Sequence, residues 1–230
     1  MPTTDAQALA EQLLLGRYRV LETRGEGGFG TVYVCWDPRL MRRVAIKSIR
    51  LKPQAPQGSL VEGMPDYLSD ARRSALLRAA LDETRTASML PHPNIVQMIE
   101  FDNDDEHAYI IMEYVEGASL AELLDATEDG LLTADEAAAV VEGVCDALEF
   151  DHDNGVLHLD IKPDNIMVDM SGRVKLADFG MATLSSMTGY SGARGGTVGY
   201  MPPEQAEGGE VDVRTDVFAF AAVMYEALCG

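Results

Sequence analysis

Cysteine is scarce in this sequence, with three residues among 230. Cys35, Cys145 and Cys229 lie far apart, and their number is odd. This pattern excludes a disulfide framework, and none of the spacings matches a zinc-ligand motif. We therefore expect three small, reduced core residues in a cytoplasmic protein.

Basic residues are also few: 18 Lys and Arg stand against 38 Asp and Glu, which gives a formal net charge of −20. Such a surface repels nucleic-acid phosphates and anionic lipid, so neither is expected as a partner. No apolar run reaches the roughly 18 residues of a membrane helix, and no basic segment precedes an apolar one at the N-terminus. The sequence therefore predicts neither a membrane span nor a signal peptide.

Strand signals dominate the first half of the chain, where short apolar runs alternate with turns rich in Gly or Pro. A helical period in the apolar residues appears only near the start and after residue 66. The expected elements, in chain order, are a helix over 4–15, three strands within 18–50, a loop over 52–66, a helix over 67–90 and strands near 95–101 and 108–114.

Helical signals dominate the second half. Thr133 and Glu136 have the spacing of a capping box, which predicts an Ala/Val-rich helix running to about His152. The apolar stretch over 217–229 predicts another helix, which we expect to be buried on all sides. A strand-rich half followed by a helix-rich half indicates an α+β protein with two lobes.

A glycine-rich turn, Gly25-Glu26-Gly27-Gly28-Phe29-Gly30, joins the first two strands. GxGxxG alone is a weak signal, because an ordinary hairpin turn uses glycine in the same way. The strand-like TVYV that follows excludes a dinucleotide fingerprint, which opens a helix. A glycine-rich hairpin can instead let backbone N–H groups approach a polyphosphate, with Val32 packing over a flat base.

Lys47 stands in the strand-like run Val-Ala-Ile-Lys. A lysine between apolar strand residues commonly lays its stem along the surface and keeps its ammonium in water. Glu83, on the helix predicted downstream, offers a counter-ion. A lysine held by a carboxylate can instead present a fixed positive charge to phosphate oxygens.

The densest group of polar side chains lies in His-Leu-Asp-Ile-Lys-Pro-Asp-Asn, residues 158–165. Asp160, Lys162 and Asn165 supply a base, a phosphate-binding cation and a metal-binding amide within one short loop. A solvated turn can hold such residues by chance, but apolar flanks on both sides attach this loop to a core. Asp178, which ends another short apolar strand before Phe-Gly, is a candidate ligand for a hard cation.

In kind and order these motifs resemble the protein kinase family over about residues 16–230, and IKPDNI and GYMPPEQA are similar to bacterial eukaryotic-like Ser/Thr kinases. The resemblance implies a bilobal protein-kinase-like fold, with an antiparallel five-stranded N-lobe that carries helix C and a mostly helical C-lobe. It also implies Mg²⁺-dependent transfer of the γ-phosphoryl group of ATP to Ser or Thr hydroxyls of protein substrates, including autophosphorylation.

The resemblance assigns roles to individual residues. Asp160 would accept the proton of the substrate hydroxyl, and Asp216 would support the catalytic loop. The implied catalytic residues are Asp160, Lys162, Lys47, Glu83 and Thr197, and the implied Mg²⁺ ligands are Asn165 and Asp178. The implied nucleotide-binding residues are Gly25, Gly27, Gly28, Gly30, Val32, Ala45, Lys47, Met112, Glu113 and Val115.

Two features depart from the family pattern. Leu159 stands where an Arg that pairs with a phosphorylated activation loop is usual, so we expect activity without such a phosphate. Glu204 lacks the Arg partner that later helices supply, because the pattern stops partway through the helical lobe. We therefore expect an N-terminal extension over 1–15, an N-lobe over 16–115 with an inserted loop at 52–66, and an incomplete C-lobe over 116–230.

Two other functions stay open. An incomplete C-lobe would suit a catalytically impaired nucleotide-binding or scaffold module with a kinase fold. A small-molecule phosphotransferase of related fold would share the catalytic Asp and Asn, but it should lack the Gly196-Thr197 and Pro-Pro-Glu segments seen in this sequence.

Overall fold

The computed structural model describes residues 13–27, 30–50, 91–104, 107–178 and 199–230. The chain divides into two compact units. Among the described residues, those before residue 51 join Met98–Tyr114 in the first unit, and residues 91–97 join Val115–Gly230 in the second. Within the described residues, no helix is long and apolar enough to cross a membrane.

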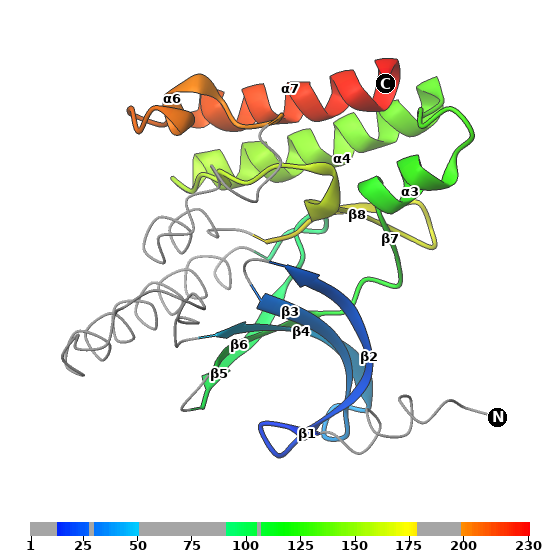
Figure 1. The fold of residues 1–230 in the computed structure, drawn as a ribbon, viewed down its shortest axis with the longest axis vertical. Coiled ribbons are helices and arrows are strands. Elements are labelled where there is room, and N and C mark those ends of the chain that lie inside the picture. Colours follow the sequence, from blue (N-terminus) through cyan, green and yellow to red (C-terminus); the bar gives the residue numbers. More distant parts are fainter. Residues whose placement is uncertain (1–12, 28–29, 51–90, 105–106, 179–198) are drawn as a thin grey trace, which may run out of the picture. The chain divides into compact units, whose positions relative to one another are not determined.

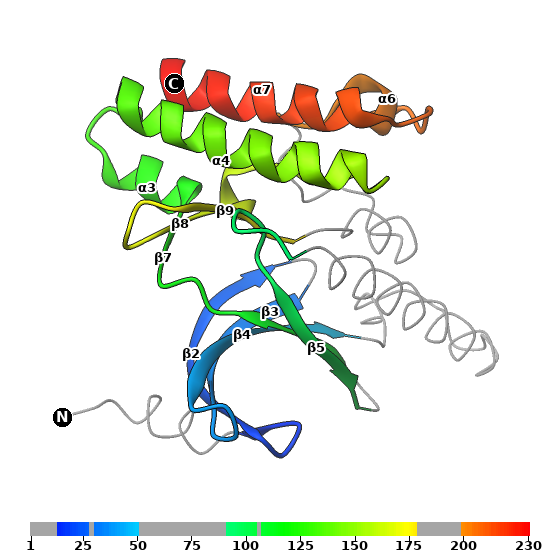
Figure 2. The same ribbon diagram turned by 180° about the vertical axis from the view of Figure 1, so that it is seen from behind.

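The first unit is built on an antiparallel sheet (Figures 1 and 2). Its strand order is β1-β2-β3-β4-β6-β5, so the five expected strands are joined by a sixth, two-residue strand at one edge. The strands are β1 (Leu13–Leu14), β2 (Tyr18–Gly27), β3 (Gly30–Asp37), β4 (Arg42–Arg50), β5 (Met98–Asn103) and β6 (His107–Glu113).

The short strand β1 corrects the helix predicted over 4–15. Leu13 and Leu14 pair with Arg19 and Tyr18 of β2, and the turn between them has positive φ at residues 15 and 16. Burial of Leu14 in the core of the sheet outweighs the helix propensity of the leucine run, so the prediction is wrong for residues 13–15. Residues 4–12, the predicted loop 52–66 and the predicted helix 67–90 lie outside the described residues.

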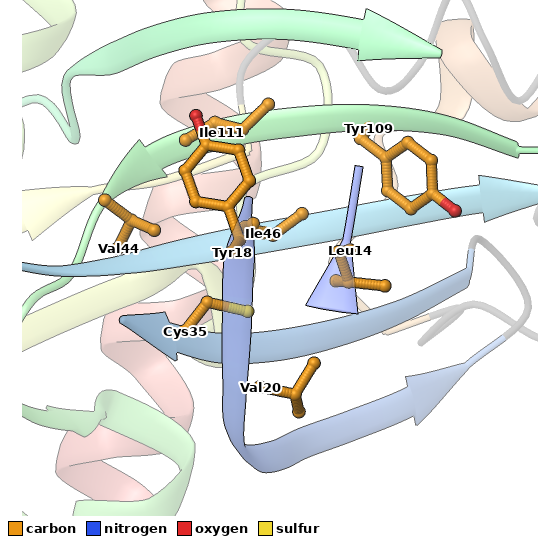
Figure 3. Packing of buried hydrophobic residues seen from close by; sticks show 8 residues of the cluster. All are labelled: Leu14, Tyr18, Val20, Cys35, Val44, Ile46, Tyr109 and Ile111. Atoms are coloured by element: carbon orange, nitrogen blue, oxygen red, sulfur yellow. The ribbon is translucent and has the colours of Figure 1, made fainter. Parts of the chain in front are cut away.

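One face of the first sheet carries a hydrophobic core (Figure 3). Alternate residues along each strand point to this face, as the two-residue period of a strand requires. Ile46 of β4, for example, lies between Tyr33 of β3 and Ile111 of β6 in the strand register. The buried members are Leu14, Tyr18, Val20, Cys35, Val44, Ile46, Tyr109 and Ile111. The intervening residues of β3, β4 and β6 therefore face the other side, where the candidate site residues lie.

The second unit combines helices with a small three-stranded sheet of order β7-β8-β9. Helices α4 and α7 lie side by side, as both views show (Figures 1 and 2). The elements are β7 (Gly117–Ser119), α3 (Leu120–Ala126), α4 (Ala134–Asp153), a 3₁₀ turn η1 (Pro163–Asn165), β8 (Ile166–Asp169), β9 (Val174–Leu176), α6 (Pro203–Ala206) and α7 (Val213–Cys229).

The two long helices begin at side-chain caps. The predicted capping box of α4 is confirmed, because the Thr133 hydroxyl accepts from the Glu136 N–H while Glu136 accepts from the Thr133 N–H. Helix α7 begins four residues earlier than its apolar stretch, at a cap formed by Asp212. It buries one face and exposes Val217, Phe218, Tyr225 and Leu228, so the expectation of burial on all sides is wrong for the described chain.

Residues 91–97 belong with the second unit, whereas we expected the division to fall at residue 116. Backbone bonds join this segment to β9: the Val96 N–H donates to Leu176 O at 2.8 Å, and the Leu176 N–H donates to Asn94 O at 2.7 Å. The Asn94 amide also donates to Val174 O. These bonds hold the segment against the small sheet although it precedes β5 in the sequence.

Gly143, in the middle of α4, is expected to resist substitution by alanine. At an exposed position within a helix, a Gly→Ala change would raise the free energy of unfolding by roughly 1 kcal/mol. At this position a Cβ atom would lie 2.7 Å from the Cβ of Val174 and 3.1 Å from Nδ2 of Asn94. We predict that Gly143→Ala lowers the free energy of unfolding in urea by about 1–3 kcal/mol.

The double variant Gly143→Ala/Val174→Gly is the control for that steric reason. Glycine at position 174 removes the Cβ atom that the new methyl group would meet, so the double variant should lose less stability than the sum of the two single changes. Stabilisation by Gly143→Ala alone would contradict the prediction.

Candidate active site

The candidate catalytic loop runs from His158 to Asn165 and is held by one buried carboxylate from α7. Asp216, only 1% exposed, accepts the backbone N–H of His158 at 2.9 Å and that of Leu159 at 2.8 Å. Nε2 of His152, near the end of α4, lies 2.9 Å from the same carboxylate. The start of the loop is therefore attached to both long helices.

The buried side chain of His158 joins the loop to the strand end that carries Asp178. Its Nε2 lies 2.9 Å from Ala177 O, and its Nδ1 accepts the Asp160 N–H at 3.2 Å. An imidazole that donates through one nitrogen and accepts through the other is neutral. Burial lowers the pKa of His158, which agrees with this neutral form.

Asp160, Lys162 and Asn165 are brought together as the sequence predicts. Nδ2 of Asn165 donates to the backbone oxygen of Asp160 at 2.7 Å and to its Oδ2 at 3.0 Å. Nζ of Lys162 lies 3.2 Å from the same Oδ2. The Asp160 side chain stays 31% exposed, so a hydroxyl can reach a carboxylate that is already oriented by two partners.

Asp178 lies just beyond β9, and a backbone hydrogen bond joins the residue before it to Asn165. The Ala177 N–H donates to Asn165 O at 2.8 Å, which places the residue before Asp178 against the end of η1. Asp178 itself adopts a positive φ of 66°. Such a backbone is uncommon for residues other than glycine, and it often occurs at functional sites.

The oxygen donors of this group fit Mg²⁺. Nδ2 of Asn165 is engaged by Asp160, which leaves the amide oxygen as the coordinating atom, and Asp178 adds a carboxylate. Among the described residues, no three His, Cys, Asp or Glu side chains converge on a potential metal site. Mg²⁺ suits such a sparse set, because it commonly takes one or two protein ligands and completes its shell with phosphate oxygens and water.

The candidate nucleotide residues of the first unit share the face opposite its hydrophobic core. In the strand register Val32 pairs with Lys47, and Ala45 pairs with Met112. Val32, Ala45 and Met112 are half-buried, whereas Lys47 is only 6% exposed. The sheet thus presents an apolar surface suited to a flat ring, beside one buried cation.

The glycine-rich turn lies at the β2–β3 hairpin. Gly25 pairs with Val32, and Gly27 pairs with Gly30. Gly30 has a φ of 126°, and a Cβ there would lie 1.9 Å from Ser48 O on β4, so only glycine fits. Glu113 ends β6, and Val115 follows as a half-buried residue of the second unit. Gly28, Glu83 and Thr197 lie outside the described residues.

Three features of the site were not predicted. Nε2 of Gln205 donates to Leu159 O at 2.8 Å. Glu204, for which we expected no Arg partner, accepts from Oγ1 of Thr215 on α7 at 2.9 Å. Both contacts join residues far apart in sequence, and no local pattern marks them.

The third feature is a buried acid beside the loop anchor. Asp151 of α4 is 0% exposed, and neither of its carboxyl oxygens has a hydrogen-bond partner among the described residues. Burial, and then the nearby negative charge of Asp216, raise the pKa of Asp151 to about 7. The carboxyl-terminal end of the helix dipole adds to the cost of a negative charge there.

The first unit carries a buried strand lysine, and the second carries an Asp-Lys-Asn loop beside another Asp. Residues of these kinds are typical of phosphotransferases. Comparison with known families then makes the assignment specific: residues 18–230 match the protein kinase domain, so the chain belongs to the protein kinase family. This match confirms the fold class that the motifs predict.

Two similar proteins come from bacteria. The chain is 38% identical over 217 residues to the serine/threonine-protein kinase PrkC of Bacillus subtilis (strain 168), covering 94% of this chain and 31% of that protein. It is 36% identical over 224 residues to the serine/threonine-protein kinase PknB of Mycobacterium leprae (strain TN), covering 94% and 33%. The chain spans about a third of the length of either relative.

The buried acid gives a pH-dependent prediction. The folded protein holds the Asp151 proton more tightly than the unfolded chain does, so the contribution of Asp151 to the stability of the wild type falls as pH rises from about 4 to about 7. Asp151→Asn keeps the shape and removes the ionisation. We predict that the stability of this variant relative to wild type increases by about 2 kcal/mol between pH 5.5 and pH 8, in urea unfolding experiments.

Asp153→Asn is the matched control, since Asp153 is an exposed carboxyl on the last turn of the same helix. Its stability difference from wild type should change little with pH. A difference between Asp151→Asn and wild type that is equal at both pH values would show that Asp151 is not protonated in the folded protein.

Proposed function

We propose that this chain transfers the γ-phosphoryl group of Mg²⁺·ATP to Ser or Thr hydroxyls of proteins. The observation that carries the proposal is the Asp160 carboxylate, partly exposed and held by both Asn165 and Lys162. A carboxylate so placed is suited to orient a hydroxyl and accept its proton. The family match and the kinase relatives support the same reaction class.

Each polar group of the site has a separate role in this proposal. Mg²⁺·ATP, when bound, supplies the phosphoryl group and the positive charge of the metal. Asn165 and Asp178 hold the cation through oxygen atoms, and the Nζ group of Lys162 offsets charge on the phosphoryl group as it moves. Asp160 accepts the hydroxyl proton, so the site combines positioning with charge neutralisation.

The first unit, together with Val115 of the second, binds the nucleotide in this proposal. Val32, Ala45 and Met112 contact the base, the backbone at Glu113 and Val115 bonds its edge, and the glycines of the β2–β3 turn approach the phosphates. Lys47 neutralises the α- and β-phosphates, with Glu83 as its counter-ion. Thr197 faces the protein substrate. These last two roles follow from the resemblance to the family.

The setting of the reaction is also part of the proposal. Of the three cysteines expected in the core, Cys35 is buried, but the expectation is wrong for Cys145 and Cys229, which are exposed free thiols. Exposed thiols suit a reducing compartment, and we place the activity in the cytoplasm. The acidic composition supports protein substrates over nucleic acid. Autophosphorylation on Ser or Thr is included, without a requirement for it as an activating step.

Asp160→Asn tests the base. The variant keeps the size of the side chain but has no carboxylate to take the proton, so kcat should fall by at least about 100-fold. The measurement is transfer of radiolabelled phosphate from ATP to a generic basic protein and to the chain itself. Asp153→Asn, an exposed change of the same type, should keep wild-type activity. Transfer by Asp160→Asn at near the wild-type rate would refute the assignment.

Lys47→Met tests the nucleotide half of the site. The variant keeps an unbranched apolar stem but removes the buried charge, so phosphate transfer should be lost while the thermal midpoint stays within a few degrees of wild type. Inactive wild-type protein that is nevertheless stabilised by ATP would favour the alternative of a nucleotide-binding module.

A further inference from the structure

Leu159, directly before the candidate base, has a backbone conformation that leucine rarely adopts. Its φ is 62°, in the left-handed region, where the Cβ atom crowds the backbone. Such a conformation persists only when surrounding contacts hold it. The contacts around Leu159 therefore bear directly on where the Asp160 carboxylate points.

Both backbone polar groups of Leu159 are held by side chains from other elements. Its N–H donates to Oδ1 of Asp216 on α7 at 2.8 Å, and its carbonyl accepts from Nε2 of Gln205 on α6 at 2.8 Å. The carbonyl of Leu159 and the N–H of Asp160 belong to the same peptide unit, and that N–H donates to Nδ1 of His158 at 3.2 Å. Gln205 and His158 thus fix the two ends of the peptide plane that leads into Asp160.

Helix α6 is itself held in place by hydrogen bonds, so the Gln205 amide donates from a fixed position. Glu204, the preceding residue, accepts from Thr215 of α7, and the Gly209 N–H donates to Glu204 O at 2.7 Å. Gln205 is half-buried, which limits competition from water for its amide. The anchor of the loop, Asp216, lies one residue beyond Thr215 on the same helix.

We propose that Gln205 is a positioning residue: its amide holds the Leu159–Asp160 peptide, and through it the orientation of the Asp160 carboxylate during phosphoryl transfer. The proposal deepens the function proposed above and rests on it. Gln205 lies in the segment that follows Thr197, the residue that the resemblance places at the protein substrate. In this proposal Gln205 therefore connects that segment directly to the peptide that leads into Asp160. Small misplacements of a reacting group are costly in rate, while they leave nucleotide binding by other residues unchanged.

Gln205→Met is the test variant, because methionine has nearly the same length and shape but no donor. We expect kcat to fall about 10- to 100-fold with the KM for ATP within about twofold of wild type. Glu210→Gln, an exposed change close by in the same segment, is the matched control and should keep the wild-type kcat. Equal kcat in Gln205→Met and wild type would overturn the proposal.

Amide hydrogen exchange provides a readout that needs no activity. In Gln205→Met, the amides of residues 159 and 160 should exchange at least about fivefold faster, while those in the middle of α4 and α7 keep wild-type rates. Unchanged exchange at residues 159 and 160 would overturn the proposal even if kcat fell. Exchange that is faster throughout the unit would do the same, because it would show a structural role only.

Two further outcomes, a variant that does not fold and a wild-type protein that transfers no phosphate, can each be distinguished from failure of the proposal. If Gln205→Met does not fold, Gln205→Asn replaces it, since the shorter amide cannot span the same distance and should give the same two results. If wild-type protein transfers no phosphate, the proposed function fails, and the exchange experiment alone decides whether Gln205 holds the loop.

Discussion

The Asp216 carboxylate accepts two consecutive backbone N–H groups of the candidate catalytic loop and lies within hydrogen-bond distance of His152 on α4. A buried charge is tolerated only when hydrogen bonds replace the water it has lost, and those from the loop do so. The loop and the carboxylate therefore stabilise each other: without the loop the charge would be unsolvated, and without the charge the loop would lack its attachment to α7. The rest of the candidate site in the second unit depends on this interaction.

A similar arrangement recurs at the residues that precede Asp160 and Asp178, the two candidate site aspartates. Leu159, before Asp160, is held at its N–H by Asp216 and at its carbonyl by Gln205. Ala177, before Asp178, donates its N–H to Asn165 O, and its carbonyl lies 2.9 Å from Nε2 of His158. Leu159 and Asp178 are two of only four non-glycine residues with positive φ in the described chain. Two of the four thus lie at Asp178 itself or directly before Asp160, and hydrogen bonds to both polar groups of the residue before each aspartate hold the backbone there.

Local sequence patterns predicted the parts of this structure that local physics determines. The spacing of Thr133 and Glu136 predicts the capping box, and short apolar runs between turns predict the strand that contains Lys47 and the strand that precedes it. Both features are present. The helix predicted through Leu13–Leu14 was wrong, because a tertiary contact with β2 decides the conformation of a two-residue segment. Gln205 and Asp151 were missed for a related reason: their significance depends on groups 46 and 65 residues away, Leu159 and Asp216. Gln205 belongs to the motif GYMPPEQA, but the motif does not reveal its contact with Leu159.

A net charge of −20 is compatible with phosphate binding, because most of the acidic side chains among the described residues are exposed to water whereas the candidate phosphate-binding lysines are largely buried. Exposed acids interact through water and salt, which screen them beyond about 8 Å at physiological ionic strength. Lys47 is nearly buried in the sheet of the first unit, and Nζ of Lys162 in the second unit lies 3.2 Å from the Asp160 carboxylate. Charges in such positions are weakly screened, so each lysine can dominate the field in its own surroundings whatever the distant surface carries. Composition therefore limits which large partners are attracted, while burial determines which small anion can be held.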